Sequence, residues 1–127
     1  MEEKLIFIVD DDKVILNLLE YTFRSQERFE VKTFYSGEEC LKNLDLKPDL
    51  IVLDHIFSLC GESNMSGLDT LKEIRKKGQK VPVIILSSQD DHSLIHEFMQ
   101  NGAAKYITKK DYFIDTLVEC VEKVMAN

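Results

Sequence analysis

The chain has 127 residues, of which 44% are hydrophobic, and this size suits one globular domain with a single hydrophobic core. Its 16 basic and 23 acidic side chains give a formal net charge of -7, which argues against direct nucleic-acid binding because that binding rewards a basic surface. Because the N-terminus lacks a signal peptide's basic start and apolar stretch, and no apolar run could span a bilayer, we expect residues 1–127 to form one cytoplasmic domain without a membrane partner.

The first apolar run, at residues 5–9, predicts a buried strand that ends at two acidic residues, Asp10 and Asp11. Apolar side chains with helical spacing follow, and Asp12 stands where it can accept hydrogen bonds from the free amides of that helix's first turn. The side chains that carry the helical pattern are Val14, Ile15, Leu18, Leu19, Thr22 and Phe23. The chain therefore begins with a strand, an acidic cluster and a helix.

A second strand and a second helix precede the next strongly apolar run. Residues 29–34 predict the strand, and Ser36, followed by a glycine, marks the beginning of the helix. Residues 47–49, Lys-Pro-Asp, interrupt the chain before the run at residues 50–53, which ends on Asp54. A carboxylate at the end of so buried a strand needs hydrogen bonds or a positive partner, so its position suggests a function.

The second half of the chain continues the alternation of helix and strand. After a third helix, residues 83–86 predict a strand that ends on Ser87. A fourth helix closes at Gly102, residues 106–108 predict a strand that ends on Lys109, and a fifth helix follows. The apolar side chains of these three helices are Leu68, Leu71 and Ile74; Leu94, Ile95, Phe98 and Met99; and Ile114, Leu117, Val118, Val121, Val124 and Met125.

Five strands that alternate with five helices predict an α/β fold built on a parallel sheet. Parallel neighbours need crossover connections, and right-handed crossovers place helices on both faces, so we expect a doubly wound, flavodoxin-like sheet with strand order 2-1-3-4-5. Such sheets bind ligands at the carboxyl ends of their strands. We therefore expect the strand-end residues to meet at one edge; they are Asp10, Asp11, Asp54, Ser87 and Lys109.

The expected cluster of three carboxylates suggests a metal site. Like charges raise one another's pKa and oppose folding unless a cation compensates them, and hard oxygen ligands with few carboxylates suit Mg2+. Beside a divalent cation, an ammonium group and a hydroxyl, Asp54 can attack a phosphoryl group and hold it as an acyl phosphate. Taken singly, Lys109 is more simply an ion-pair partner and Ser87 a strand-end cap. The combination favours phosphoryl chemistry.

Four segments resemble the receiver domain of two-component response regulators, in particular the single-domain type typified by chemotaxis regulators. They are FIVDDD at residues 7–12, DLIVLD at 49–54, VIILSS at 83–88 and YITKKD at 106–111. The resemblance implies that Asp54 accepts a phosphoryl group from the phosphohistidine of a sensor histidine kinase or a histidine phosphotransfer protein. It implies a signalling phosphoacceptor that is no enzyme in the ordinary sense, because it catalyses only its own phosphotransfer and dephosphorylation.

The same resemblance implies a ligand set and a switch. Ser87 and Lys109 would bind the phosphoryl oxygens, and Ser87 and Tyr106 would change the face formed by the fourth helix, fifth strand and fifth helix. An output protein that the sequence does not identify would bind that face, and the domain would act as a monomer or a phosphorylation-linked dimer. The implied Mg2+ ligands are the carboxylates of Asp10, Asp11 and Asp54 and the backbone carbonyl of Ile56.

Two features depart from the family pattern. Residues 57–65 are longer than the short loop with proline that is usual after the phosphoacceptor. Lys110 stands where a proline commonly follows the family's lysine in a cis peptide bond. A cis bond without proline costs roughly 2.5 to 4 kcal/mol, so the bond between Lys109 and Lys110 is expected to be strained or trans.

Three other functions are alternatives to this one. A phosphoaspartate hydrolase of small molecules would need a cap beside its nucleophile, which the sequence does not indicate. A flavodoxin-like cofactor module would need a phosphate loop where residues 10–12 instead present three carboxylates that repel phosphate. A receiver-like scaffold that binds partners without phosphorylation remains as the alternative.

Overall fold

The computed structural model describes residues 3–54 and 65–126. Within these residues, five strands form one sheet in the order β2-β1-β3-β4-β5, and every neighbouring pair is parallel. The strands are β1 (Lys4–Val9), β2 (Phe29–Phe34), β3 (Leu50–Asp54), β4 (Val83–Ser87) and β5 (Lys105–Thr108). The predicted doubly wound sheet and its strand order are confirmed.

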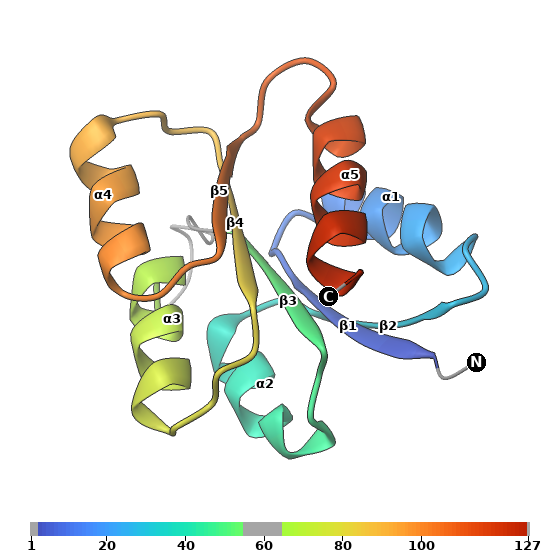
Figure 1. Ribbon diagram of the computed structural model, residues 1–127, viewed down its shortest axis with the longest axis horizontal. Coiled ribbons are helices and arrows are strands. Elements are labelled where there is room, and N and C mark those ends of the chain that lie inside the picture. Colours follow the sequence, from blue (N-terminus) through green and yellow to red (C-terminus); the bar gives the residue numbers. More distant parts are fainter. Residues whose placement is uncertain (1–2, 55–64, 127) are drawn as a thin grey trace.

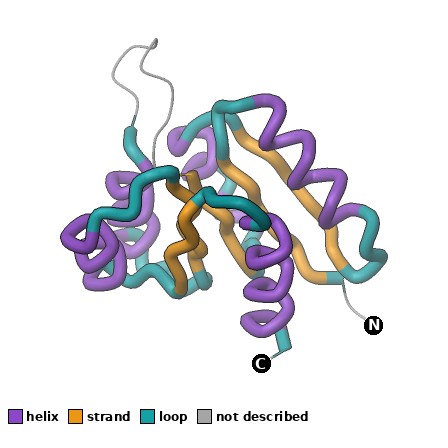
Figure 2. Tube along the Cα trace, turned by 90° about the horizontal axis from the view of Figure 1, so that it is seen from above, coloured by secondary structure: helices purple, strands orange, loops and turns teal. Residues whose placement is uncertain are grey.

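The helices cover the two faces of the sheet. They are α1 (Lys13–Arg24), α2 (Gly37–Lys42), α3 (Gly67–Lys76), α4 (His92–Gln100) and α5 (Phe113–Met125). Helices α1 and α5 pack on one face and α2, α3 and α4 on the other, as Figures 1 and 2 show. A short 3-10 helix at Leu44–Leu46, which was not predicted, precedes the break before β3. None of the helices in the described part of the chain is long and apolar enough to cross a membrane.

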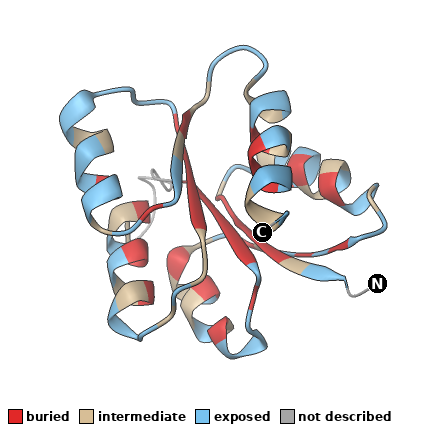
Figure 3. Cartoon of the chain, viewed as in Figure 1, coloured by how far each residue is buried: buried red, intermediate tan, exposed pale blue. Residues whose placement is uncertain are grey.

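Strands β3 and β4 are buried along their whole length, which explains their continuous apolar runs (Figure 3). Successive side chains of a strand point to opposite faces of the sheet. In β1, Ile6 and Ile8 therefore pack in the cluster with α1 and α5, whereas Phe7 and Val9 pack in the cluster on the other face. A strand covered on both sides needs apolar residues at every position.

Helix α1 begins as predicted, but its apolar residues extend beyond the side of the helix that faces the core. The Asp12 side chain accepts hydrogen bonds from the amides of Val14 and Ile15 and so caps the helix. The side chain of Val14 is nevertheless 73% exposed and that of Leu18 44% exposed. Leu16, which lay outside the predicted pattern, is buried. The helix itself is confirmed, and packing decides which of its apolar residues lie in the core.

Candidate functional site

The parallel sheet brings four chain segments to one edge. Asp10 follows β1, Asp54 and Ser87 are the last residues of β3 and β4, and Lys109 follows β5. The register aligns these ends, since Asp54 pairs with Leu86 of β4 one residue before Ser87. Residues that are far apart in the chain therefore meet where parallel sheets form their ligand sites.

Three carboxylates converge at this edge. One oxygen from each of Asp10, Asp11 and Asp54 lies within 4.8 Å of the others. Asp10 and Asp54 are buried, at 1% and 4% exposed, whereas Asp11 is half-buried. Asp10 Oδ1 also accepts a hydrogen bond of 2.9 Å from the amide of Asp12, which fixes the orientation of its carboxylate.

Lys109 supplies positive charge to this cluster. Its Nζ donates a hydrogen bond of 2.7 Å to Asp54 Oδ1 and a longer one of 3.4 Å to Asp10 Oδ2. Its backbone amide donates to Ser87 O at 2.7 Å, which ties the end of β5 to the end of β4. The peptide bond from Lys109 to Lys110 is trans, which is one of the two outcomes expected for this position.

The site is electrostatically unbalanced without a further cation. The pKa of Asp54 is raised from 3.8 to about 7, first by burial and then by the charge of Asp10, and Lys109 opposes both effects. Burial also raises the pKa of Asp10 and of Asp11. Burial alone would lower the pKa of Lys109, but its hydrogen bond and attraction to Asp54 leave that pKa raised. One ammonium group therefore faces three carboxylates that resist ionisation.

The chemistry of these donors fits Mg2+. Three carboxylate oxygens offer hard ligands, and the small number of protein ligands leaves room for water and phosphate oxygens, as Mg2+ prefers. The fourth predicted ligand, the backbone carbonyl of Ile56, lies outside the described residues, as do residues 57–64 of the long loop.

Ser87 and Tyr106 are connected through the backbone of Gln89. Ser87 is buried, and its Oγ accepts a hydrogen bond of 3.0 Å from the Gln89 amide. The Tyr106 hydroxyl donates a hydrogen bond of 2.6 Å to Gln89 O. Sequence reasoning missed this link because a peptide group of any residue type could make it. The two predicted switch residues thus share one main-chain connection.

Comparison with known proteins gives one family. A model of the response regulator receiver domain matches residues 6–122. The chain is 33% identical over 107 residues to the alkaline phosphatase synthesis transcriptional regulatory protein PhoP of Bacillus subtilis. This match covers 84% of this chain and 42% of that protein. It is 31% identical over 127 residues to the nitrate/nitrite response regulator protein homolog of Haemophilus influenzae, and this match covers 98% of this chain and 58% of that protein. The chain spans only 15 to 58% of the length of five such curated relatives.

Solved structures give the same result. The receiver domain of the Francisella response regulator 1452 superposes with a TM-score of 0.82 at 28% identity, covering 96% of each chain. The response regulator domain of Thermotoga maritima CheB superposes with a TM-score of 0.80 at 27% identity, covering 98% of this chain and 96% of that one. The sheet and helices described above are thus the arrangement that these domains share.

Proposed function

The chain belongs to the response regulator receiver domain family of two-component signalling, and we propose that Asp54 is its phosphoacceptor. The carrying observation is the position of its carboxylate at the buried end of β3. There it lies 2.7 Å from Lys109 Nζ and within 4.8 Å of oxygens of Asp10 and Asp11. A nucleophilic oxygen, a fixed ammonium group and the donors for a divalent cation are then in one place.

In the proposed reaction, an oxygen of the ionised Asp54 attacks the phosphorus of a phosphohistidine. The bond from phosphorus to the imidazole nitrogen breaks, the imidazole leaves with the bonding electrons and takes a proton, and an acyl phosphate remains on Asp54. Lys109 balances the charge of the phosphoryl oxygens, and the Ser87 hydroxyl donates a hydrogen bond to one of them. Mg2+, held by Asp10, Asp11 and Asp54, would neutralise further phosphoryl charge and keep Asp54 ionised.

The proposed donor is a sensor histidine kinase or a histidine phosphotransfer protein. The proposed output is a change of the face formed by α4, β5 and α5, read by a partner protein or by a second copy of the chain. The link from Ser87 through Gln89 to Tyr106 supports this. A movement of the Ser87 hydroxyl towards a phosphoryl group would disturb its hydrogen bond with the Gln89 amide, and the carbonyl of the same residue accepts the hydrogen bond from Tyr106. The domain, which we take as residues 1–127, would catalyse only its own phosphotransfer and dephosphorylation.

The test is the intact mass of the wild type and of Asp54→Asn after incubation with acetyl phosphate and Mg2+. We expect one added phosphoryl group on the wild type, none on Asp54→Asn, and none on the wild type in excess chelator. Asp45→Asn, which changes an exposed carboxylate of the short 3-10 helix, is the matched control and should be modified like the wild type.

Two results would contradict the proposal. Modification of Asp54→Asn would place the phosphoacceptor elsewhere. A wild type that remains unmodified with both acetyl phosphate and phosphorylated histidine kinases would favour the scaffold that works without phosphorylation.

A further inference from the structure

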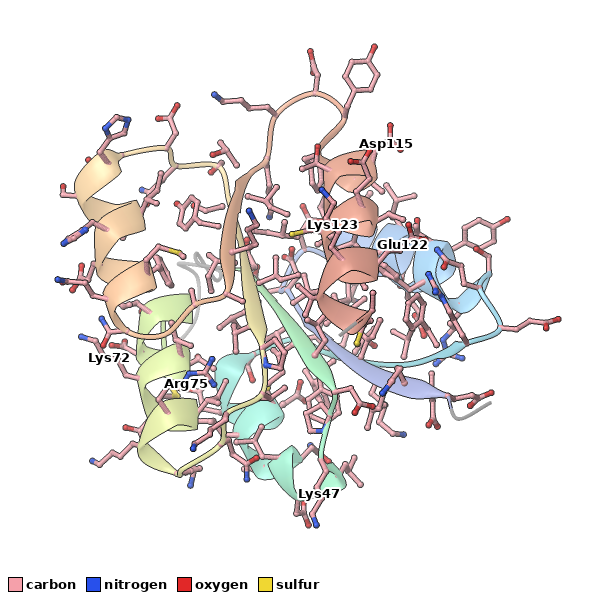
Figure 4. The ribbon with its side chains drawn as sticks, viewed as in Figure 1. Lys47, Lys72, Arg75, Asp115, Glu122 and Lys123 are labelled. Atoms are coloured by element: carbon pink, nitrogen blue, oxygen red, sulfur yellow. The ribbon has the colours of Figure 1, made fainter. Side chains whose placement is uncertain are left out.

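Arg75, in the last turn of α3, holds main-chain carbonyls of two separate segments. Its Nη1 donates hydrogen bonds of 3.0 Å to Gln79 O and 2.8 Å to Val81 O, in the connection from α3 to β4. Its Nη2 donates a bond of 2.7 Å to Gly102 O, in the turn from α4 to β5. The side chain, labelled in Figure 4, therefore joins the end of α3 to the end of α4.

The contact with Gly102 is close enough to require glycine. Gly102 has a φ of +98°, a conformation that other residues rarely adopt. A Cβ at this position would also lie 2.8 Å from Arg75 Nε. Glycine at residue 102 therefore permits both the conformation of the turn and its close approach to Arg75.

The charge of Arg75 has no carboxylate partner among the ion pairs of residues 3–54 and 65–126. The half-buried guanidinium is instead surrounded by three carbonyl dipoles. Hydrogen bonds with one charged group are stronger than those between neutral groups. The planar fork of arginine can reach several carbonyls at once, which the single ammonium of lysine does poorly.

The two ends of α4 are held very differently. Near the C-terminal end, Phe98 is fully buried, its carbonyl accepts a hydrogen bond from the amide of Ala103, and the amide of Ala104 donates to Val83 O in β4. At the N-terminal end, His92 and Ser93 are exposed and Leu94 is half-buried. The C-terminal end is therefore attached to β4 and, through Arg75, to α3.

The N-terminal end of α4 is the one connected to the candidate site. Residues 88–91 join it to Ser87, and all four are exposed. The contacts of this segment include the hydrogen bonds of Gln89 with Ser87 and Tyr106, the cap that Asp91 provides to the amide of Ser93, and an exposed ion pair of 3.7 Å between Lys110 and Asp90. Exposed ion pairs contribute little to stability, so this end moves more easily.

We propose that Arg75 makes the C-terminal end of α4 a fixed end, about which phosphorylation moves the N-terminal half of the helix. The proposal rests on the proposed function, since phosphorylation of Asp54 is what would displace Ser87 and residues 88–91. A helix of nine residues is about 13.5 Å long, so a tilt of about 10° at the fixed end displaces the other end by about 2.4 Å. Arg75 is thus a positioning residue that converts a small shift at Ser87 into a directed tilt.

The test compares hydrogen exchange in residues 88–95 and 98–104, with and without acetyl phosphate, in Mg2+, using the full chain. In the wild type we expect phosphorylation to change exchange in residues 88–95 and to leave 98–104 unchanged. In Arg75→Met, residues 98–104 should exchange about tenfold faster even before phosphorylation, because the turn loses charge-assisted hydrogen bonds. The decisive result is that phosphorylation then changes exchange at both ends of α4. A purely structural role for Arg75 would accelerate exchange equally in both states.

Arg24→Met is the matched control, because Arg24 also donates to a main-chain carbonyl, that of Val31, but from α1 to β2. It should keep the wild-type pattern in α4. Arg75→Lys, which retains the charge, serves if Arg75→Met does not fold, and it should show the same change at both ends. Intact mass is measured on every sample. A wild type that stays unphosphorylated both with acetyl phosphate and with phosphorylated histidine kinases overturns the proposed function and the fixed end with it. Two results would overturn the fixed end alone. One is that phosphorylation changes hydrogen exchange at both ends of α4 in the wild type. The other is that, in the Arg75 variants, phosphorylation changes exchange only in residues 88–95.

Discussion

At the scale of single residues, Asp54 shows a conflict between folding and chemistry. Its carboxyl has a pKa near 7 in the folded protein, mainly because of burial, against an ordinary value of 3.8. Between about pH 4 and pH 7 the folded chain therefore holds a proton that the unfolded chain has released. Without a divalent cation, stability contributed by this group is present at low pH and is lost as the pH rises towards 7.

Replacing this carboxyl by an amide should relieve the conflict. In excess chelator at about pH 8, Asp54→Asn should raise the free energy of unfolding by about 1 to 3 kcal/mol, because an uncharged group of nearly the same shape replaces a buried charge. At about pH 4, the Asp54 carboxyl of the folded wild type is protonated and uncharged. The difference in unfolding free energy between Asp54→Asn and the wild type should then largely disappear. Urea unfolding at the two pH values measures both quantities.

Asp45→Asn again provides the control, since its exposed carboxylate should leave the unfolding free energy nearly unchanged at both pH values. If Asp54→Asn destabilised the chelated protein at about pH 8, the hydrogen bond from Lys109 would outweigh the burial of the Asp54 charge. The predicted dependence on pH would then be wrong in sign.

At the scale of helices and strands, sequence reasoning succeeded where one local pattern permits one structure. The short, fully apolar runs at β3 and β4 indicate strands covered on both faces, and their ends located Asp54 and Ser87. Sequence reasoning was incomplete for α1, because apolar residues occupy more than one side of this helix. Only the tertiary packing determines that Leu16 is buried and Val14 is exposed. Contacts between main-chain groups and distant side chains, such as Gly102 with Arg75, leave no periodic pattern to detect.

The contact between α2 and α3 offers a test of how tightly two elements pack. Gly37, in the first turn of α2, lies so close to α3 that a Cβ there would collide with Thr70 Oγ1. Gly37→Ala should therefore lower the free energy of unfolding by about 1 to 3 kcal/mol, the usual cost of overpacking a core. Chemical denaturation of the variant and the wild type gives this difference.

A second substitution separates crowding from an effect of alanine on the backbone. Thr70→Ala removes the colliding hydroxyl, so the double variant should be more stable than the sum of the two single changes predicts. A favourable coupling of about 1 kcal/mol is expected for residues in direct contact. Strict additivity would show that the two helices move apart without strain.

At the scale of the whole molecule, the site exists only when the sheet is complete. Asp10, Asp54 and Lys109 come from the ends of β1, β3 and β5, so their charges meet only in the folded chain. Their repulsion and attraction are therefore part of the stability of the domain. A cation that binds this cluster binds the folded state and hardly the unfolded one, which links metal binding to folding.

Mg2+ should consequently raise the melting temperature. At a concentration about 100-fold above its dissociation constant, a ligand specific to the folded state adds about 2.7 kcal/mol, or about 10 °C for a domain of this size. Thermal unfolding with increasing Mg2+ at constant pH measures the effect. NaCl at equal ionic strength separates specific binding from screening, which acts on every exposed charge.

Asp11→Asn should abolish most of this increase, because it removes one of the three proposed carboxylate ligands from a half-buried position without leaving an unpaired buried charge. Asp45→Asn should respond to Mg2+ as the wild type does. Asp11→Asn should also melt at a higher temperature than the wild type in excess chelator, since one source of repulsion is gone. The two effects have opposite signs, so a general loss of stability cannot imitate them. If Asp11→Asn kept the full response to Mg2+, the cation would bind away from the ends of β1 and β3.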